Sequence, residues 1–321
     1  MAIRHGSSHP THAWDTDYHA PALVDSVVEL LGAGMLVLDG TLGGGGHSAA
    51  LLDAGVARVI GIDRDRQALD TAGERLAVDV AAGRFEAHRA NYADLGRVPA
   101  LHDLQLTGIL LDLGISSHQI DDAARGFSFR EGAPLDMRMG ADASRTGAQV
   151  LNESDDSELA TLFRTYGDEP RAGRLAREIV RRRGTRPFET SDDLVGAIRA
   201  TFGSRSGAPE FARLFQAVRI AVNDELAGLE RALPDLRDRL APGGTLAIIA
   251  YHSGEDRLVK HAFRAWSEAC ICPPKHPMCT CGGDHSLGDV LTRRAITASA
   301  AETAGNPRAR SARLRAWQRA R

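Results

Sequence analysis

The sequence lacks long hydrophobic runs and a signal peptide. No uninterrupted apolar run in its 321 residues approaches the ~20 residues that a membrane-spanning helix needs, which excludes a transmembrane protein. Residues 1–18 have no apolar core and no periodicity, so we expect a flexible leader there and a cytoplasmic protein. The composition, 43% hydrophobic and 25% charged, is typical of a globular chain, and the length suggests two domains or one core with a large insertion.

Lysine is nearly absent, because 37 of the 39 basic residues are arginine. The net charge of -3 argues against a strongly basic or strongly acidic protein, but two segments are locally basic. Residues 171–186 contain seven Arg and one acid, and residues 286–321 contain eight Arg and two acids. Arginine suits phosphate binding and base stacking, so either segment is a candidate for nucleic-acid contact. An arginine bias in the genome would give the same excess, and the charge alone leaves both readings open.

The first third of the chain alternates between helix and strand patterns. Helical patterns cover residues 22–31, 48–54 and 65–78, and apolar strand patterns cover residues 35–39, 59–63 and 107–113, with a short strand near residue 85. This alternation predicts an α/β fold with a doubly wound, Rossmann-like sheet.

The alternation stops after residue 119 and returns at a predicted strand over residues 245–251. The segment between has apolar residues at helical spacing over residues 155–166, 170–183, 191–202 and 210–240. We therefore predict a core formed by residues 19–119 and 222–321, interrupted by a helical insertion over residues 120–221.

A glycine-rich loop predicts a nucleotide-type cofactor. Residues 39–47 read DGTLGGGGH between a predicted strand and a predicted helix. Glycine permits a tight turn and close approach of a ligand, and the N-terminus of the helix presents free N–H groups. Asp63 ends the next strand, where a carboxylate can accept the hydroxyl hydrogens of a ribose. Asp112 ends the fourth strand, where a ligand contact is favoured over a capping role.

A nicotinamide dinucleotide site uses the same kind of acid, so an NAD-dependent oxidoreductase is one alternative. The loop does not spell G-x-G-x-x-G, because Gly43 and Gly45 would require glycine at Ser48. A non-catalytic RNA-binding protein of ribosome assembly is a second alternative.

On its motifs the sequence resembles the bacterial MraW-type family, the cytosine-N4 methyltransferases of small-subunit (16S) ribosomal RNA. The resemblance covers almost the whole chain, in residues 19–28, 39–48 (DGTLGGGGHS), 61–65 (GIDRD), 109–117 (ILLDLGISS), 125–129 (RGFSF), 134–139 (PLDMRM), 215–223 (FQAVRIAVN) and 306–310 (NPRAR). It implies a class I methyltransferase sheet and S-adenosylmethionine as cofactor. It also implies methyl transfer to the exocyclic N4 of a cytidine near the decoding site, within an assembled or late-assembling 30S subunit.

The resemblance also implies which residues hold the cofactor. The methionine part would lie against Gly45, Gly46 and His47, and the ribose against Asp63. Tyr92 would lie near the adenine, where such proteins often have Phe, and the remaining polar contacts would come from Asp112 and Gln119. The sequence departs from the family pattern at His118, where proline is common, and at Gly254, which replaces an expected leucine.

Cytosine N4 is a poor nucleophile, so the site needs an acceptor for an amine hydrogen. The acid or amide followed by Pro-Pro-aromatic that many amino-methyltransferases carry is missing from this chain. Our hypothesis is that Asp136 and His252 line the cytosine pocket and that Ser116 orients the amine. The competing reading is that Asp136 forms a salt bridge with a nearby arginine and that His252 only caps a helix.

The helical insertion is the predicted RNA platform, because a base must leave its stack to be modified. The arginines at helical spacing in the insertion form one phosphate-facing stripe or, alternatively, a solvated face. These are Arg174, Arg177, Arg181 and Arg182.

All four cysteines fall within twelve residues, in a C-x-C-x6-C-x-C pattern. In a reducing cytosol this spacing favours a structural zinc over disulfides, although C-x-C is less usual than C-x2-C. Free thiols or a redox pair remain open alternatives. The residues are Cys270, Cys272, Cys279 and Cys281.

Overall fold

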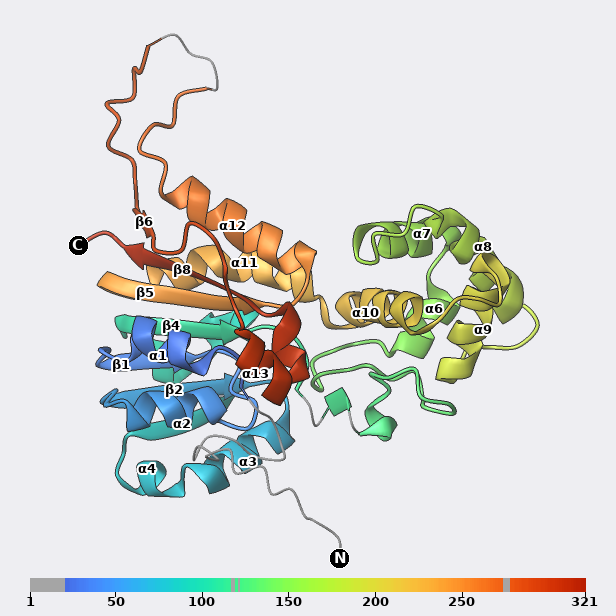
Figure 1. Cartoon of the computed structure of the whole chain (residues 1–321), viewed down its shortest axis with the longest axis horizontal. Helices are drawn as coiled ribbons and strands as arrows, with labels where there is room; N and C mark the ends of the chain where they lie inside the picture. Colours follow the sequence, from blue (N-terminus) through green and yellow to red (C-terminus); the bar gives the residue numbers. More distant parts are fainter. Residues whose placement is uncertain (1–20, 117–118, 121, 274–277) are drawn as a thin grey trace, which may run out of the picture.

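The computed structural model describes residues 21–116, 119–120, 122–273 and 278–321, so the predicted leader over residues 1–18 lies outside the described residues. Within them the chain forms an eight-stranded sheet with the strand order β3-β2-β1-β4-β5-β8-β6, and β7 pairs with β8 (Figure 1). The strands are β1 Leu36–Asp39, β2 Arg58–Asp63, β3 Phe85–Arg89, β4 Leu106–Asp112, β5 Leu240–Ala250, β6 Gly288–Val290, β7 Ile296–Thr297 and β8 Arg313–Arg319.

The sheet confirms the predicted doubly wound α/β class. Strands β1 to β5 pair in parallel, and the strand order reverses between β1 and β4. In such sheets a crevice opens at the carboxyl ends of the strands where the order reverses. The topology therefore positions a ligand site at the ends of β1 and β4.

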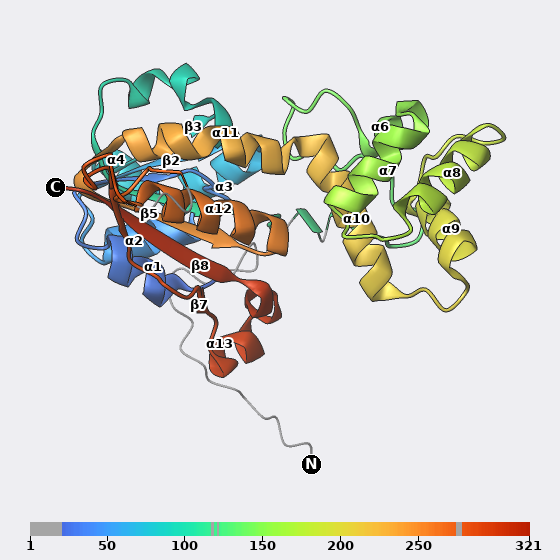
Figure 2. The same ribbon diagram turned by 90° about the horizontal axis from the view of Figure 1, so that it is seen from above.

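Both faces of the sheet are covered by helices, which explains why the central strands β1, β2, β4 and β5 are buried over most of their length. Neighbouring residues alternate between two separate cores: Val37 and Ile249 pack with α1 and α2, whereas Leu38 and Ile248 pack with α11 and α12. Figure 2 shows these two helical layers on opposite sides of the sheet. The helices are α1 Val24–Leu31, α2 Gly46–Asp53, α3 Arg66–Arg75, α4 Ala77–Ala81, α11 Glu225–Asp238, α12 Ser253–Trp266 and α13 Ala300–Gly305.

The segment between β4 and β5 is helical, and its buried side chains form a core of their own. Leu159, Phe163, Ile179 and Leu214 are fully buried within it, and the helices lie beside the sheet rather than on it (Figures 1 and 2). Its helices are α6 Gly147–Glu153, α7 Asp156–Thr165, α8 Ala172–Arg183, α9 Ser191–Phe202 and α10 Ala208–Asn223. The domain boundaries at residues 120 and 221 stay a prediction.

One sequence expectation about the elements is wrong, and one strand was not predicted. The single helix predicted over residues 210–240 is broken at Asp224, whose φ of 53° is left-handed, and this break turns the chain from α10 into α11. The sequence did not indicate β8, which pairs antiparallel with β5, because three arginines and a glutamine among its seven residues leave no apolar run.

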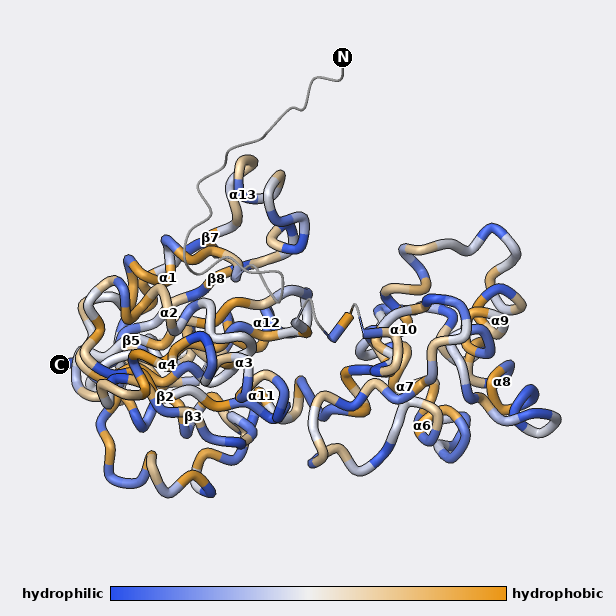
Figure 3. Tube along the Cα trace, turned by 90° about the horizontal axis from the view of Figure 1, so that it is seen from below, coloured by the Kyte–Doolittle hydropathy of each residue, from blue (hydrophilic) through white to orange (hydrophobic). Residues whose placement is uncertain are grey.

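Hydropathy along the chain agrees with this layering. Apolar residues gather along the sheet strands, and apolar and polar residues alternate along the helices (Figure 3). Among the described residues, no helix combines the length and the apolar character required to cross a bilayer.

Candidate functional site

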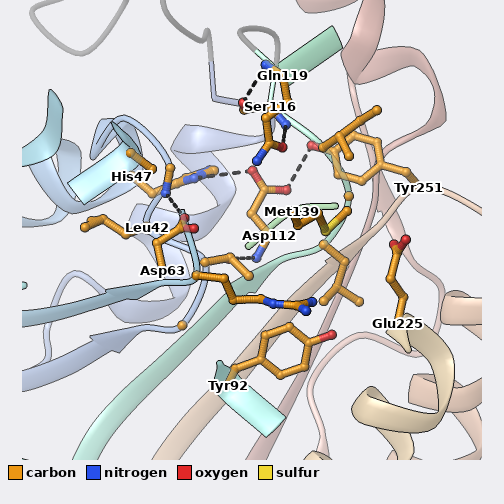
Figure 4. A pocket seen from close by; sticks show the side chains of 18 of the residues that line it. Leu42, His47, Asp63, Tyr92, Asp112, Ser116, Gln119, Met139, Glu225 and Tyr251 are labelled. Atoms are coloured by element: carbon orange, nitrogen blue, oxygen red, sulfur yellow. Dashed lines mark hydrogen bonds and ion pairs between the residues drawn. The ribbon is translucent and has the colours of Figure 1, made fainter. Parts of the chain in front are cut away.

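A cleft opens where the strand order reverses, and we call it the first cleft. It holds about 1050 Å³ of space not filled by atoms, part of it open to solvent. Figure 4 shows side chains from β2, β4 and the glycine loop pointing into it. The residues that line it include Gly40, Thr41, Leu42, Gly43, Gly46, His47, Asp63, Tyr92, Asp112, Gly114, Ser116, Gln119, Met139, Glu225, Tyr251 and Glu255.

The glycine loop forms one wall of the first cleft. Gly43 and Gly45 have φ values of 51° and 75°, a left-handed conformation that side chains disfavour. The loop is fixed to the sheet because Ser48 Oγ donates to the buried Asp39 Oδ2 at 2.7 Å. Gly45 caps α2 and packs against Ala72, so it does not line the cleft, whereas Gly46 does.

Asp63 is held at the end of β2 by two backbone groups. The N–H of Gly43 donates to its Oδ2 at 2.8 Å, and the N–H of Asp65 donates to its Oδ1 at 2.8 Å. Burial raises the pKa of Asp63 to about 6, against the effect of these two hydrogen bonds. Each oxygen keeps a further lone pair, so the carboxylate can accept two hydroxyl hydrogens from a ligand.

His47, Asp112 and Tyr251 form a connected polar group across the cleft. His47 Nε2 lies 2.9 Å from the carbonyl oxygen of Ala22, which can only accept, so the proton is assigned to Nε2. Its Nδ1 lies 3.7 Å from Asp112 Oδ2. The Tyr251 hydroxyl donates to Asp112 Oδ1 at 2.9 Å. Burial, and then Asp112, raise the pKa of Tyr251 well above its usual value, so the phenol keeps its proton.

A second network joins the loop after β4 to β2. Gln119 Nε2 and Arg125 Nη1 both donate to Asp65 Oδ2, at 3.1 and 2.8 Å. Ser116 N–H donates to Gln119 Oε1 at 3.1 Å. Burial alone would raise the pKa of Asp65, but the bonds from Arg125 and Gln119 hold it below its usual value. Sequence reasoning missed Asp65 and Arg125, although both lie in quoted motifs.

The far side of the first cleft is formed by a tyrosine and two buried acids. Burial raises the pKa of Tyr92, so its ring stays neutral beside the cleft. Arg219 Nη2 donates to Glu225 Oε2 at 2.8 Å. Sequence reasoning did not single out Glu225 or Glu255, since nothing in the local pattern distinguishes them from other helix-initiating acids.

A second cleft adjoins the first and shares Gly114, Ile115 and Tyr251 with it. Its walls are largely apolar and aromatic, with Phe127, Phe129 and Phe215, and the Phe129 and Phe215 rings meet edge to face at 6.0 Å. The remaining lining residues include Ile120, Ser128, Gln216, Arg219, Asn306, Arg308 and Ser311. The second cleft therefore offers ring-sized apolar surface bordered by polar groups, next to the polar first cleft.

The three predicted catalytic residues lie in different places. Ser116 lines the first cleft. Asp136 forms a bidentate ion pair with Arg138, whose Nε and Nη2 donate to its two oxygens at 2.8 Å each. Asp136 lines neither of the two clefts. His252 caps α12, since its Nδ1 accepts from the N–H of Gly254 at 3.2 Å, and it lines a third cavity beside Arg213 and Arg257.

The predicted arginine stripe lies on α8. Arg174, Arg177 and Arg181 are exposed. Arg181 Nη2 and Arg182 Nε each lie 2.7 Å from Glu178 Oε1. Part of the stripe is therefore neutralised within the helix.

Comparison with known proteins gives the following matches. A family model described as the MraW methylase family matches residues 16–320. The protein named ribosomal RNA small subunit methyltransferase H from Gemmatimonas aurantiaca is 62% identical over 303 residues, covering 94% of this chain and 96% of that protein. Its namesake from Heliobacterium modesticaldum is 45% identical, covering 95% of this chain and 99% of the relative. Among solved structures, an rRNA methylase from Streptococcus thermophilus matches with a TM-score of 0.41 and 12% identity, over 93% of this chain and 94% of its own.

Proposed function

Because the chain belongs to the MraW methylase family, we propose that it transfers a methyl group from S-adenosylmethionine to the exocyclic N4 of a cytidine in small-subunit ribosomal RNA. The observation that carries this proposal is the junction of the two clefts at Tyr251. A polar cleft suited to a nucleoside-containing cofactor there meets an aromatic cleft suited to a planar base.

The residues of the first cleft fit S-adenosylmethionine. When bound, the cofactor supplies a methyl group on a positively charged sulfur. Asp63 would accept hydrogen bonds from the ribose hydroxyls, and Tyr92 would lie beside the adenine. Gly46 and His47 would hold the methionine part at the beginning of α2, where N–H groups favour a carboxylate. The negative charge of Asp112 lies in the same cleft and favours the positive sulfur.

Gly45 contributes differently from its neighbours. Its left-handed backbone begins α2, and a Cβ there would lie 3.1 Å from Ala72 Cβ. We therefore assign it to shaping the loop that holds the cofactor.

Tyr251, Asp112 and Ser116 orient the amine. The Tyr251 hydroxyl donates to Asp112, so its oxygen is free to accept one hydrogen of the cytosine amine. This directs the nitrogen lone pair towards the methyl group. On methyl transfer the Tyr251 oxygen would receive the proton that the amine releases, while the phenol proton would pass to Asp112 Oδ1. Ser116, at the rim of the same cleft, offers a second acceptor.

In this proposal Asp136 and His252 hold neighbouring segments in position and do not contact the cytosine. The bidentate pair of Asp136 with Arg138 fixes the chain before Met139, which lines the first cleft. His252 caps the helix that follows Tyr251 directly. Single-turnover methylation by D136N and H252A, with cofactor affinity measured separately, tests this assignment. A loss of rate at saturating cofactor in D136N, with unchanged loop structure, would make Asp136 a catalytic residue.

RNA binds across the helical insertion and the rim of the second cleft. The exposed arginines of α8 are placed for phosphate contacts, and Asn306 and Arg308 border the cleft that takes the base. The whole base must leave its stack to enter. The proposed substrate is the assembled or late-assembling 30S subunit in the cytoplasm.

The test uses methyl-labelled S-adenosylmethionine with either free 16S RNA or 30S subunits from a strain that lacks the modification. Nucleoside mass spectrometry is expected to find N4-methylcytidine, with 30S as the better substrate. Methyl incorporation at another base or atom would refute the cytosine-N4 assignment. RNA binding without any transfer would favour the non-catalytic alternative, and the methylase family already argues against the oxidoreductase.

A further inference from the structure

The segment between α12 and β6 extends away from the sheet (Figure 1). We call residues 267–287 the cysteine loop; among them, the structure describes 267–273 and 278–287. None of these described residues is buried. Backbone bonds close its base, from Leu287 N–H to the Trp266 carbonyl at 2.8 Å and from His285 N–H to the Ala269 carbonyl at 3.0 Å. Beyond these bonds the structure describes residues 270–273 and 278–284, which we call the outer part of the cysteine loop. Hydrophobic packing does not hold these residues.

The four cysteine sulfurs converge in that outer part. All four lie within 4.8 Å of one another, although the two pairs are separated in sequence. The Cys270 to Cys279 and Cys279 to Cys281 distances are 3.6 Å, and the Cys281 to Cys270 distance is 3.7 Å. A disulfide would need about 2.05 Å, and all four cysteines are free.

These separations match the edges of a tetrahedral metal site. With Zn–S bonds of about 2.3 Å, the sulfurs of a tetrahedral zinc thiolate lie about 3.8 Å apart. Three of the six sulfur–sulfur distances agree with this value, and the other three, which involve Cys272, are at most 4.8 Å. A cluster of several irons needs more widely spaced thiolates, so the geometry favours a single ion.

The backbone around the sulfurs also favours a metal site. The N–H of Thr280 donates to Cys272 Sγ at 3.3 Å, a bond that stabilises a thiolate ligand. Gly282 and Gly283 follow the last cysteine with φ values of 86° and 72°, which lets the chain turn tightly past Cys279. These features lie outside the methyl-transfer machinery.

We infer that Cys270, Cys272, Cys279 and Cys281 bind one zinc ion, which fixes the outer part of the cysteine loop. The ion takes the place of the missing hydrophobic core, as structural zinc does in other small loops. This inference does not depend on the methyltransferase activity.

Metal analysis of the purified full-length protein tests the inference. We expect about one zinc per chain in the wild type and in D284N, and a loss of at least tenfold in the C279S and C281S double variant. D284N is the matched control, because it removes a nearby exposed carboxylate and keeps the thiols. Replacing zinc with cobalt(II) is expected to give the strong visible absorption of a tetrahedral thiolate site in the wild type and in D284N, and not in the double variant.

A second measurement separates a local role from general unfolding. Chelation is expected to expose the cysteine loop to limited proteolysis while adenosylhomocysteine binding stays unchanged. Metal-free protein with four rapidly reacting thiols would overturn the inference. So would protein containing a disulfide, or protein whose metal is iron.

Discussion

Replacing Asp63 with asparagine is predicted to affect stability and ligand binding in opposite directions. The raised pKa of Asp63, about 6 against an ordinary 3.8, means that the folded protein holds the proton more tightly than the unfolded chain. The stabilisation from this proton is complete below pH 3.8 and is lost as the pH rises to about 6. The difference of 2.2 pH units corresponds to about 3 kcal/mol of burial cost for the carboxylate at neutral pH.

The isosteric amide stays neutral, so D63N removes this pH dependence. The substitution also replaces one carboxylate oxygen with an NH2 group. This group faces the backbone N–H of Gly43 or of Asp65, so one hydrogen bond is lost, at a cost of about 1–3 kcal/mol of folding stability. We therefore expect the ligand-free variant at pH 7 to be about 0–2 kcal/mol more stable than the wild type. Between pH 5 and pH 7 the wild type should lose about 1.3 kcal/mol relative to D63N.

Ligand binding should respond in the other direction. Losing a charged acceptor for the ribose hydroxyls is expected to weaken adenosylhomocysteine binding at pH 8 by about 10- to 150-fold, or about 1.5–3 kcal/mol. Wild-type affinity should also fall as the pH drops below about 6, whereas the D63N affinity should not.

Urea unfolding at pH 5 and pH 7, with calorimetric titration of adenosylhomocysteine, measures both effects. D70N is the matched control, because Asp70 is an exposed carboxylate on the neighbouring helix α3. Parallel stability curves for wild type and D63N across this pH range would exclude a buried titrating carboxylate at position 63, and unchanged affinity in D63N would exclude its contact with the ribose.

Three further predictions follow from the site. Y251F should lower the single-turnover methylation rate by about 10- to 100-fold and leave adenosylhomocysteine affinity within about twofold, because the hydroxyl acts on the amine; an unchanged rate would exclude that role. Changing Arg174, Arg177 and Arg181 together to Gln should reduce RNA affinity and lower its salt slope by about 2–3, with no effect on cofactor binding; an unchanged slope in a filter-binding titration would mean that this face is merely solvated. R125Q should lower the free energy of unfolding by about 1–3 kcal/mol, since it leaves the Asp65 carboxylate without its cation; an unchanged urea midpoint would contradict this.

Local sequence patterns were sufficient to predict the parallel part of the fold and, in the first cleft, the glycine loop, Asp63 and Asp112, whereas the family resemblance added Tyr92 and Gln119. The glycine loop and Asp63 each follow a strand, and the carboxyl ends of parallel strands meet at one edge of a sheet. Six of the seven predicted cofactor residues do line the first cleft, and Gly45 does not. Gly45 differs because it turns its backbone into the beginning of α2.

The rest depends on tertiary contacts that no local pattern reports. Arg125 reaches Asp65 across 60 positions, and Tyr251 reaches Asp112 across 139. The break at Asp224 was missed because apolar spacing continues on both sides of one left-handed residue. For Asp136 the sequence allowed two roles, a pocket residue or a salt-bridge partner, and the structure shows the bond to Arg138.

A crystal structure of a ternary complex with adenosylhomocysteine and a cytidine-containing RNA fragment would show whether the methyl donor and the acceptor base meet at Tyr251. We expect the cofactor sulfur in the first cleft and the cytosine ring in the second, with N4 beside the Tyr251 hydroxyl and about 3–4 Å from the position of the transferred methyl group. A cytosine bound outside the second cleft, or a cofactor that leaves Asp63 without a ribose contact, would contradict this expectation.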